Sequence, residues 1–263
     1  MESAKKTGRY LLFMDILGFR ELVARKGTEE VYRTITDALD EFDRWEVLNR
    51  QFRTIYFSDT FIFYQEPKGY GDWAFLDVYA IGGMLLSALL AKGIAVRGAI
   101  SFGDFEVLSD NTNKRQVYFG QALIDAYLAE QQENWIGITI LPSAWKPYEE
   151  STGRGIMTEK YEMPWLRKGD ALLLNPFIKL RGWYAADQIG EIDRPYSEWD
   201  VPDFPNEIAA FKFIHVESQR FIDANDFTGR VGSKYHATVA FLRSVLGEDK
   251  YNWACKISGV NMA

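Results

Sequence analysis

The chain has 263 residues, of which 47% are hydrophobic and 25% are charged, and its formal net charge at pH 7 is −7. This composition excludes a disordered or fibrous protein, and the negative charge disfavours nucleic acid or an anionic membrane as a partner. The single cysteine, Cys255, excludes an intramolecular disulfide framework. The polar residues 1–9 match neither a signal peptide nor a membrane span, so we expect a cytoplasmic protein.

The first predicted element is a buried strand over residues 10–17, a run that is apolar except for Asp15. Apolar residues then recur at three- and four-residue steps over residues 20–50, which predicts two helices that are broken near Gly27.

A hairpin is predicted next, because residues 52–57 and 61–64 are largely apolar and flank the short polar segment Ser58-Asp59-Thr60. Residues 72–92 predict a long buried helix that ends at Gly93, with Gly82-Gly83 allowing another element to approach closely.

The chain then alternates between short strands and helices. The predicted elements are a strand over 94–103, a hairpin over 105–108 and 117–119 with a polar tip at 110–115, a helix over 120–132, a strand over 135–141 and a short helix from Pro142. After about residue 150, prolines and tryptophans recur, which indicates a less regular extension that ends with an amphipathic helix over 232–246. We therefore expect one domain over 9–150 and an extension over 151–263 that packs on it.

Asp15 and Asp59 are the strongest candidates for a functional site. A carboxylate inside an apolar strand is costly to bury unless a cation neutralises it, and two hard oxygen ligands suit Mg²⁺ or Mn²⁺ rather than zinc. The alternative is that each aspartate only caps a strand end or a turn. Arg97 is a candidate catalytic cation, and the alternatives are an ion pair with one of these acids or a solvent-facing strand position.

Four segments together resemble the catalytic domain of class III nucleotidyl cyclases, the adenylate and guanylate cyclase family, over roughly residues 10–141. They are Phe13-Met-Asp15-Ile-Leu-Gly-Phe19, the hairpin with Asp59, Arg97-Gly-Ala-Ile-Ser-Phe-Gly103, and Val117-Tyr-Phe-Gly120. The resemblance implies an α/β (α+β) fold with a ferredoxin-like cyclase-type sheet flanked by helices and an irregular C-terminal extension. It also implies a head-to-tail homodimer.

The resemblance further implies an activity, in which Asp15 and Asp59 hold Mg²⁺ or Mn²⁺ and a nucleoside triphosphate is converted to a cyclic nucleotide plus pyrophosphate. Phosphate would bind to the backbone amides of Ile16, Leu17, Gly18 and Phe19. The base-reading residues of adenylate cyclases fall near Ile55 and Val117, so Arg53 or Gln116 would read a different base.

Two positions depart from the family pattern. Its transition-state Asn and Arg fall on Ile124 and Leu128, which cannot stabilise developing charge. Three hypotheses follow. The chain is a divergent signalling cyclase with a non-purine substrate, similar to the pyrimidine cyclases of bacterial antiphage defence. Alternatively, it is a sensor that binds nucleotide and metal without turnover, or it is a dimerisation module.

Overall fold

The computed structural model describes residues 8–43, 52–65, 73–109, 116–152, 165–168, 170–174, 205–224 and 231–260. The strands are β1 Arg9–Ile16, β2 Phe52–Phe57, β3 Thr60–Gln65, β4 Val96–Gly103, β5 Glu106–Ser109, β6 Gln116–Phe119, β7 Gly137–Ile140, β8 Trp165–Lys168 and β9 Ala171–Leu174. The helices are α1 Phe19–Lys26, α2 Thr28–Asp43, α4 Trp73–Ala91, α5 Gln121–Gln132, α6 Pro142–Thr152, α8 Pro205–Asp223, α9 Gly232–Leu246 and α10 Glu248–Ser258.

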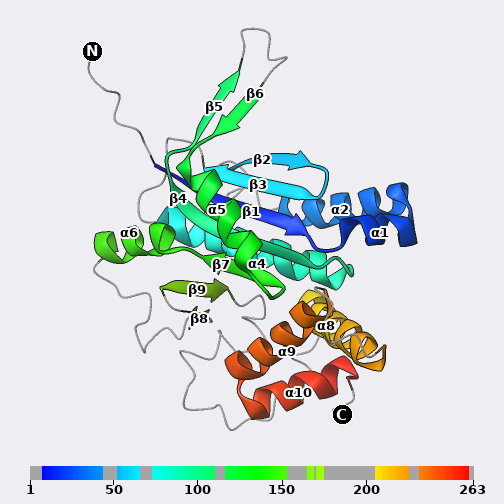
Figure 1. Cartoon of the computed structure of the whole chain (residues 1–263). Coiled ribbons are helices and arrows are strands. Elements are labelled where there is room, and N and C mark those ends of the chain that lie inside the picture. The colour runs from blue at the N-terminus through cyan, green and yellow to red at the C-terminus, as the bar shows by residue number, and fades with distance from the viewer. Residues whose placement is uncertain are drawn as a thin grey trace, which may run out of the picture.

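The main sheet has seven strands in the described part of the chain, in the order β2-β3-β1-β4-β7-β9-β8. Its pairs are antiparallel except for the parallel pair β4 and β7. Strands β5 and β6 form a separate hairpin that projects beyond this sheet (Figure 1). The predicted α+β class, a sheet flanked by helices, is therefore confirmed.

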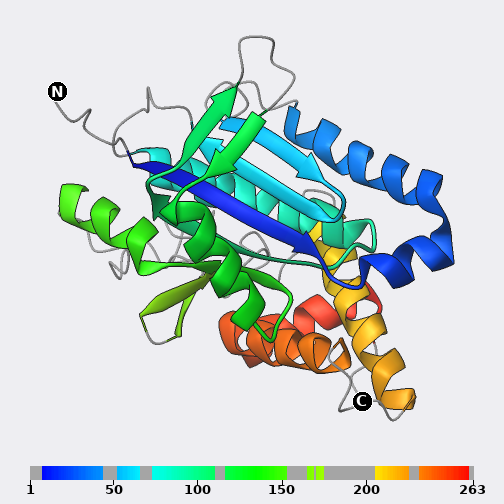
Figure 2. The ribbon, with the colours of Figure 1, turned by 45° about the horizontal axis from the view of Figure 1, so that its top comes forward.

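The residues of β1 alternate between two cores on opposite faces of the sheet, as the two-residue period of a strand requires. Leu12, Met14 and Ile16 enter the larger core with α4. Leu11 and Phe13 enter a smaller core with residues of α5. Figure 2 shows α5 in front of the sheet and α4 behind it.

Helix α4 is the central helix of the larger core. A Cβ atom on Gly82 would lie 3.2 Å from Ile138 and 3.3 Å from Leu174, so the predicted close approach is confirmed at this glycine. Residues 74–91 are long and apolar enough to cross a membrane, but 72% of this window is buried inside the protein. Because α8 packs along α4, the apolar surface of α4 is that of a core helix.

Beyond residue 152 the described residues contain more regular structure than the sequence predicts. Helix α9 has the predicted bounds, whereas β8, β9, α8 and α10 were not predicted. Strand β9 pairs with β7, so the extension adds to the same sheet. The predicted hairpin tip at 110–115 lies outside the described residues, as do the following prolines and tryptophans of the extension: Pro164, Pro176, Pro195, Pro202, Trp183 and Trp199. The division into two domains stays a prediction.

Candidate active site

Asp15 lies near the end of β1 between two neighbouring strands. Its register partners are Thr60 on β3 and Arg97 on β4. As an odd-numbered residue of β1, it is on the same face as Leu11 and Phe13, the face that α5 covers. Its side chain is 22% exposed, and the Thr60 hydroxyl donates a hydrogen bond of 3.4 Å to Asp15 Oδ1. The carboxylate is therefore partly buried and reachable from solvent.

Asp59 lies in the tight turn between β2 and β3, as predicted. The turn contains Ser58 at φ 57°, a conformation that residues other than glycine rarely adopt. The Ile16 amide donates to the Asp59 carbonyl over 2.9 Å, which ties this turn to the end of β1. The two sequence-predicted aspartates, 44 positions apart in the chain, are thereby brought to the same end of the neighbouring strands β1 and β3.

The environment of Asp15 disfavours a negative charge. The pKa of this carboxyl is raised to about 6, chiefly by burial and also by the neighbouring carboxylates of Glu130 and Asp59. The charge of Arg97 and the hydrogen bond from Thr60 lower this pKa but do not outweigh those effects. The group formed by Asp15, Asp59 and Glu130 thus carries more negative charge than Arg97 neutralises.

Arg97 pairs with two acids through the same nitrogen atom. Its Nη2 atom lies 2.5 Å from Glu130 Oε1 and 3.8 Å from Asp15 Oδ2, and its Nη1 atom donates to the Glu133 carbonyl over 3.4 Å. The ion-pair role that the sequence left open for Arg97 is therefore observed, and Glu130 is its nearer partner. A direct catalytic role for this guanidinium stays a prediction.

Glu130 was not predicted as a site residue, because a glutamate near the end of a polar helix suggests a packing or surface position. The side chain is in fact fully buried. Burial raises the pKa of Glu130, although Arg97, Gln131 and Lys234 act in the opposite direction. The available signal was the four-residue spacing of Ala122, Ala126 and Glu130, which places Glu130 on the face of α5 that packs on the sheet.

In the segment after β1, two of the backbone amides predicted to bind phosphate already donate hydrogen bonds within the protein. The Ile16 amide donates to the Asp59 backbone carbonyl, and the Leu17 amide donates to the Ala95 carbonyl over 2.8 Å. Gly18 adopts φ 70° and precedes α1, whose first residue is Phe19, with no side-chain cap hydrogen bond. Two of the four predicted phosphate-binding amides are thus used within the protein, so a phosphate site would centre on Gly18 and Phe19.

The predicted base-reading residues lie on an edge strand of the main sheet and on the separate β5–β6 hairpin. Arg53 is exposed on β2 and Gln116 is exposed on β6. The Tyr118 hydroxyl donates to the Gln116 side-chain oxygen. Their role in base recognition stays a prediction.

The two positions that depart from the family pattern lie on the outer surface of α5. Ile124 is 51% exposed and Leu128 is 50% exposed. They belong to a set of exposed apolar residues on α5 and on the β5–β6 hairpin, which we call the apolar face: Leu108, Val117, Phe119, Ile124, Tyr127 and Leu128. Direct neighbours in the hairpin register, Leu108 and Val117, are both exposed.

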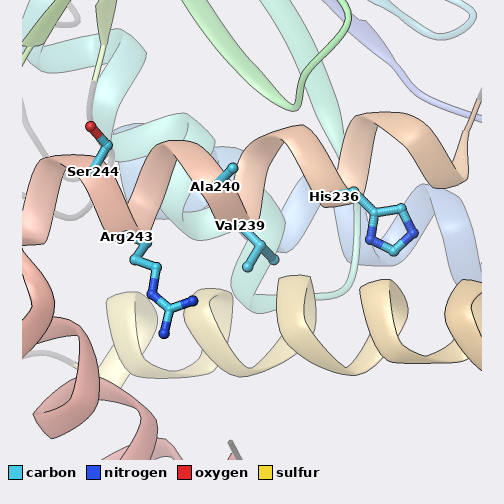
Figure 3. Close-up of a pocket in the computed structure, with 5 residues that line it drawn as sticks. All are labelled: His236, Val239, Ala240, Arg243 and Ser244. Atoms are coloured by element: carbon cyan, nitrogen blue, oxygen red, sulfur yellow. The ribbon is translucent and has the colours of Figure 1, made fainter. Parts of the chain in front are cut away.

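Elsewhere, a shallow open pocket lies along α9 (Figure 3). Its lining residues are His236, Val239, Ala240, Arg243 and Ser244. Arg243 already pairs with Glu248 at 2.9 Å, and neither Asp15 nor Asp59 lines this pocket. No cluster of three or more His, Cys, Asp or Glu side chains suited to a metal ion occurs within the described ranges. The protein donors for a cation at the aspartate site would therefore be the pair Asp15 and Asp59.

No protein-family model matches the chain, and no curated protein matches it significantly. Solved structures similar to it include the guanylyl cyclase domain of the RhoGC fusion protein from the aquatic fungus Blastocladiella emersonii, with 15% identity and a TM-score of 0.48 over 66% of this chain and 96% of that one. A second is the guanylate cyclase domain of RhGC from Catenaria anguillulae in complex with GTP, with 16% identity and a TM-score of 0.47 over 65% of this chain and 95% of that one. A third is the adenylyl cyclase CyaB from P. aeruginosa, with 13% identity and a TM-score of 0.40 over 64% of this chain and 94% of that one.

These three proteins are nucleotide cyclases, the family that the sequence motifs resemble. Similarity at these identities and TM-scores assigns no activity to the chain.

Proposed function

We propose that this chain is a divergent metal-dependent nucleotide cyclase, which converts a nucleoside triphosphate to a cyclic nucleotide and pyrophosphate. The observation that carries the proposal is the convergence of Asp15 and Asp59 at one edge of the sheet, where burial and neighbouring acids raise the pKa of Asp15. A purely structural pair of capping aspartates would gain nothing from this accumulation of negative charge.

The donor set fits Mg²⁺ or Mn²⁺. Both candidate ligands are carboxylates, and Mg²⁺ is commonly held by one or two carboxylates together with water and substrate phosphates rather than by a complete protein cage. A divalent cation would also relieve the repulsion among Asp15, Asp59 and Glu130 that is reflected in the raised pKa of Asp15.

The reaction requires the ribose 3′-oxygen to form a bond with the α-phosphorus, while the bond from this phosphorus to the leaving pyrophosphate oxygen breaks and the hydroxyl proton passes to solvent. A bound divalent ion supplies charge neutralisation and a more acidic hydroxyl. In this chain, Asp15 and Asp59 would hold the ion, and the amides of Gly18 and Phe19 at the start of α1 would bind phosphate oxygens. Arg53 and Gln116 are the proposed contacts to the base.

The apolar face supports a homodimer as the working form. Ile124, Tyr127 and Leu128 follow the three- and four-residue steps of one helix stripe, and a stripe of this kind is expected to be covered by a partner. A second copy is the occupant we propose, since the resemblance implies a site shared between two protomers.

A second candidate function is nucleotide and metal binding without turnover. It is favoured by the apolar side chains of Ile124 and Leu128 at the positions of the transition-state residues, and by the engagement of Arg97 with Glu130. A protein of this kind would act as a sensor or a dimerisation module.

The test is incubation of the full chain with ATP, GTP, CTP or UTP plus Mn²⁺, with products resolved by mass spectrometry and nucleotide binding measured in parallel with and without the metal. Asp59→Ala is the inactive comparison, and Asp40→Asn, an exposed position on α2, is the control for the loss of a carboxylate. A cyclic product that is absent only from Asp59→Ala supports the cyclase. Metal-dependent nucleotide binding without product supports the sensor, and neither binding nor product contradicts both.

A further inference from the structure

Helix α9 of the C-terminal extension contacts the segment that follows α5, about a hundred positions earlier in the chain. The Lys234 ammonium donates to the Glu133 carbonyl over 2.6 Å, and Lys234 is buried. The Ile136 amide donates to Thr238 Oγ1 over 2.8 Å. Trp135 packs against Phe241 with ring centroids 4.5 Å apart. The junction between α9 and the segment after α5 is thus buried, and it combines hydrogen bonds with apolar packing.

The same segment also contacts the aspartate site. The Glu133 carbonyl accepts hydrogen bonds from both Lys234 and Arg97. Arg97 in turn pairs with Glu130 at 2.5 Å and with Asp15 at 3.8 Å. A continuous chain of polar contacts therefore runs from Lys234 on α9 to a proposed metal ligand on β1.

The charges in this chain of contacts compete for Arg97. Glu130 and Asp15 both face the Nη2 atom of the guanidinium, and Glu130 is the closer of the two. The positive charge of Lys234 favours the ionised form of Glu130 and lowers its pKa against the effect of burial. An ionised Glu130 attracts Arg97 more strongly than a neutral one, and this attraction holds Arg97 away from Asp15.

We propose that Lys234 is a positioning residue of the aspartate site, which keeps Arg97 on Glu130 so that the Asp15 carboxylate can bind a cation. The inference rests on the proposed function in that it names how the extension supports this site. Without the charge of Lys234, Arg97 moves toward Asp15 and competes with the metal.

The test compares Lys234→Gln, which keeps a hydrogen-bond donor but removes the charge, with Lys234→Arg, which keeps both. Binding of Mn²⁺ alone is measured by calorimetric titration of the full chain. We expect the Gln variant to bind Mn²⁺ roughly tenfold more weakly, as is typical when an outer partner of a metal ligand is lost, and the Arg variant to restore most of the affinity. Thr238→Val disrupts the same junction without a charge change and should lower stability only.

Unchanged Mn²⁺ affinity in a folded Lys234→Gln protein would overturn the inference. A double-mutant cycle between Lys234→Gln and Asp15→Asn, measured by denaturant unfolding, tests it without metal. Because Lys234 and Asp15 are connected through the Glu133 carbonyl and Arg97, we expect a coupling of about threefold or more in the unfolding equilibrium constant. Strict additivity would contradict the inference, whereas a wild-type protein that binds no Mn²⁺ would contradict the proposed function instead.

Discussion

At the scale of single residues, Asp15 is ionised at neutral pH at a cost in stability. Its pKa in the folded protein is about 6, against 3.8 for an unperturbed aspartate. Because the folded state holds the proton more tightly than the unfolded state, stability falls as the pH rises through this interval, and the full cost is present above it. A residue that destabilises the fold in this way is typical of a site kept for binding.

Asp15→Asn should therefore stabilise the protein at about pH 7.5, by up to about 3 kcal/mol, and have little effect near pH 4. Denaturant unfolding at the two pH values measures the difference. Asp40→Asn, on the exposed surface of α2, should change neither value. If Asp15→Asn destabilises the protein at neutral pH, then the Arg97 contact outweighs burial and repulsion, and the electrostatic account of the site is wrong.

The sequence allowed Asp15, Asp59 and Arg97 to be chosen because each interrupts or flanks an apolar strand, where a charge has few explanations. It did not allow Glu130 and Lys234 to be chosen, because both occur in helices among other polar residues. Their importance comes from burial by elements distant in the chain: α5 against β4 for Glu130, and α9 against the segment after α5 for Lys234.

At the scale of elements, the position of α5 depends on the backbone before it. Gly120 adopts φ 149°, and a Cβ atom there would lie 2.2 Å from the Asp104 carbonyl oxygen and 2.6 Å from Phe105 Cα. Both neighbours are backbone atoms, so a side chain at this position requires α5 to move. Such a movement would also displace Glu130, which lies on the buried face of the helix.

Gly120→Ala should cost about 3 kcal/mol or more and weaken Mn²⁺ binding. Gly259→Ala is the matched comparison: its φ is also positive, at 64°, but nothing lies within 4 Å of the added Cβ. That variant should cost about 1 kcal/mol and leave binding unchanged. Thermal unfolding and metal titration of both proteins measure the two effects, and equal behaviour of the two variants would argue against a special role of Gly120.

Elements up to residue 152 could be predicted because their apolar residues recur with a helix or strand period or form a long apolar run, as in α4, and glycines mark several of their ends, as at Gly27 and Gly93. Strands β8 and β9 are four residues long, as are the predicted strands β5, β6 and β7, but they lie in the stretch where recurring prolines and tryptophans indicate irregular structure. Helix α8 follows a proline-rich stretch and begins at Pro205 itself, which suits the first turn of a helix but also resembles a loop. Its long packing contact with α4 could not be inferred from local sequence.

At the scale of the whole molecule, the apolar face is the surface on which the proposed homodimer depends. Exposed apolar side chains that are grouped on one helix stripe and one hairpin are costly for a monomer in water. The proposed homodimer would remove them from solvent.

Sedimentation velocity at micromolar concentration should detect a dimer of the wild-type chain. The double substitution Phe119→Asp and Leu128→Asp places charges in the apolar face and should yield a folded monomer. Ile222→Asp, at an exposed apolar position on α8 outside this face, should remain a dimer. A wild-type monomer, or a dimer that is insensitive to the double substitution, would show that the apolar face has another role.

The most direct test of the central claim is the binding of Mn²⁺ alone, followed by electron paramagnetic resonance of the free ion. The account predicts saturable binding by the wild-type chain and by Asp40→Asn, with binding lost in Asp15→Asn and in Asp59→Asn. Equal binding by all four folded proteins would contradict it, because the two aspartates would then be structural and the proposed chemistry would have no metal site.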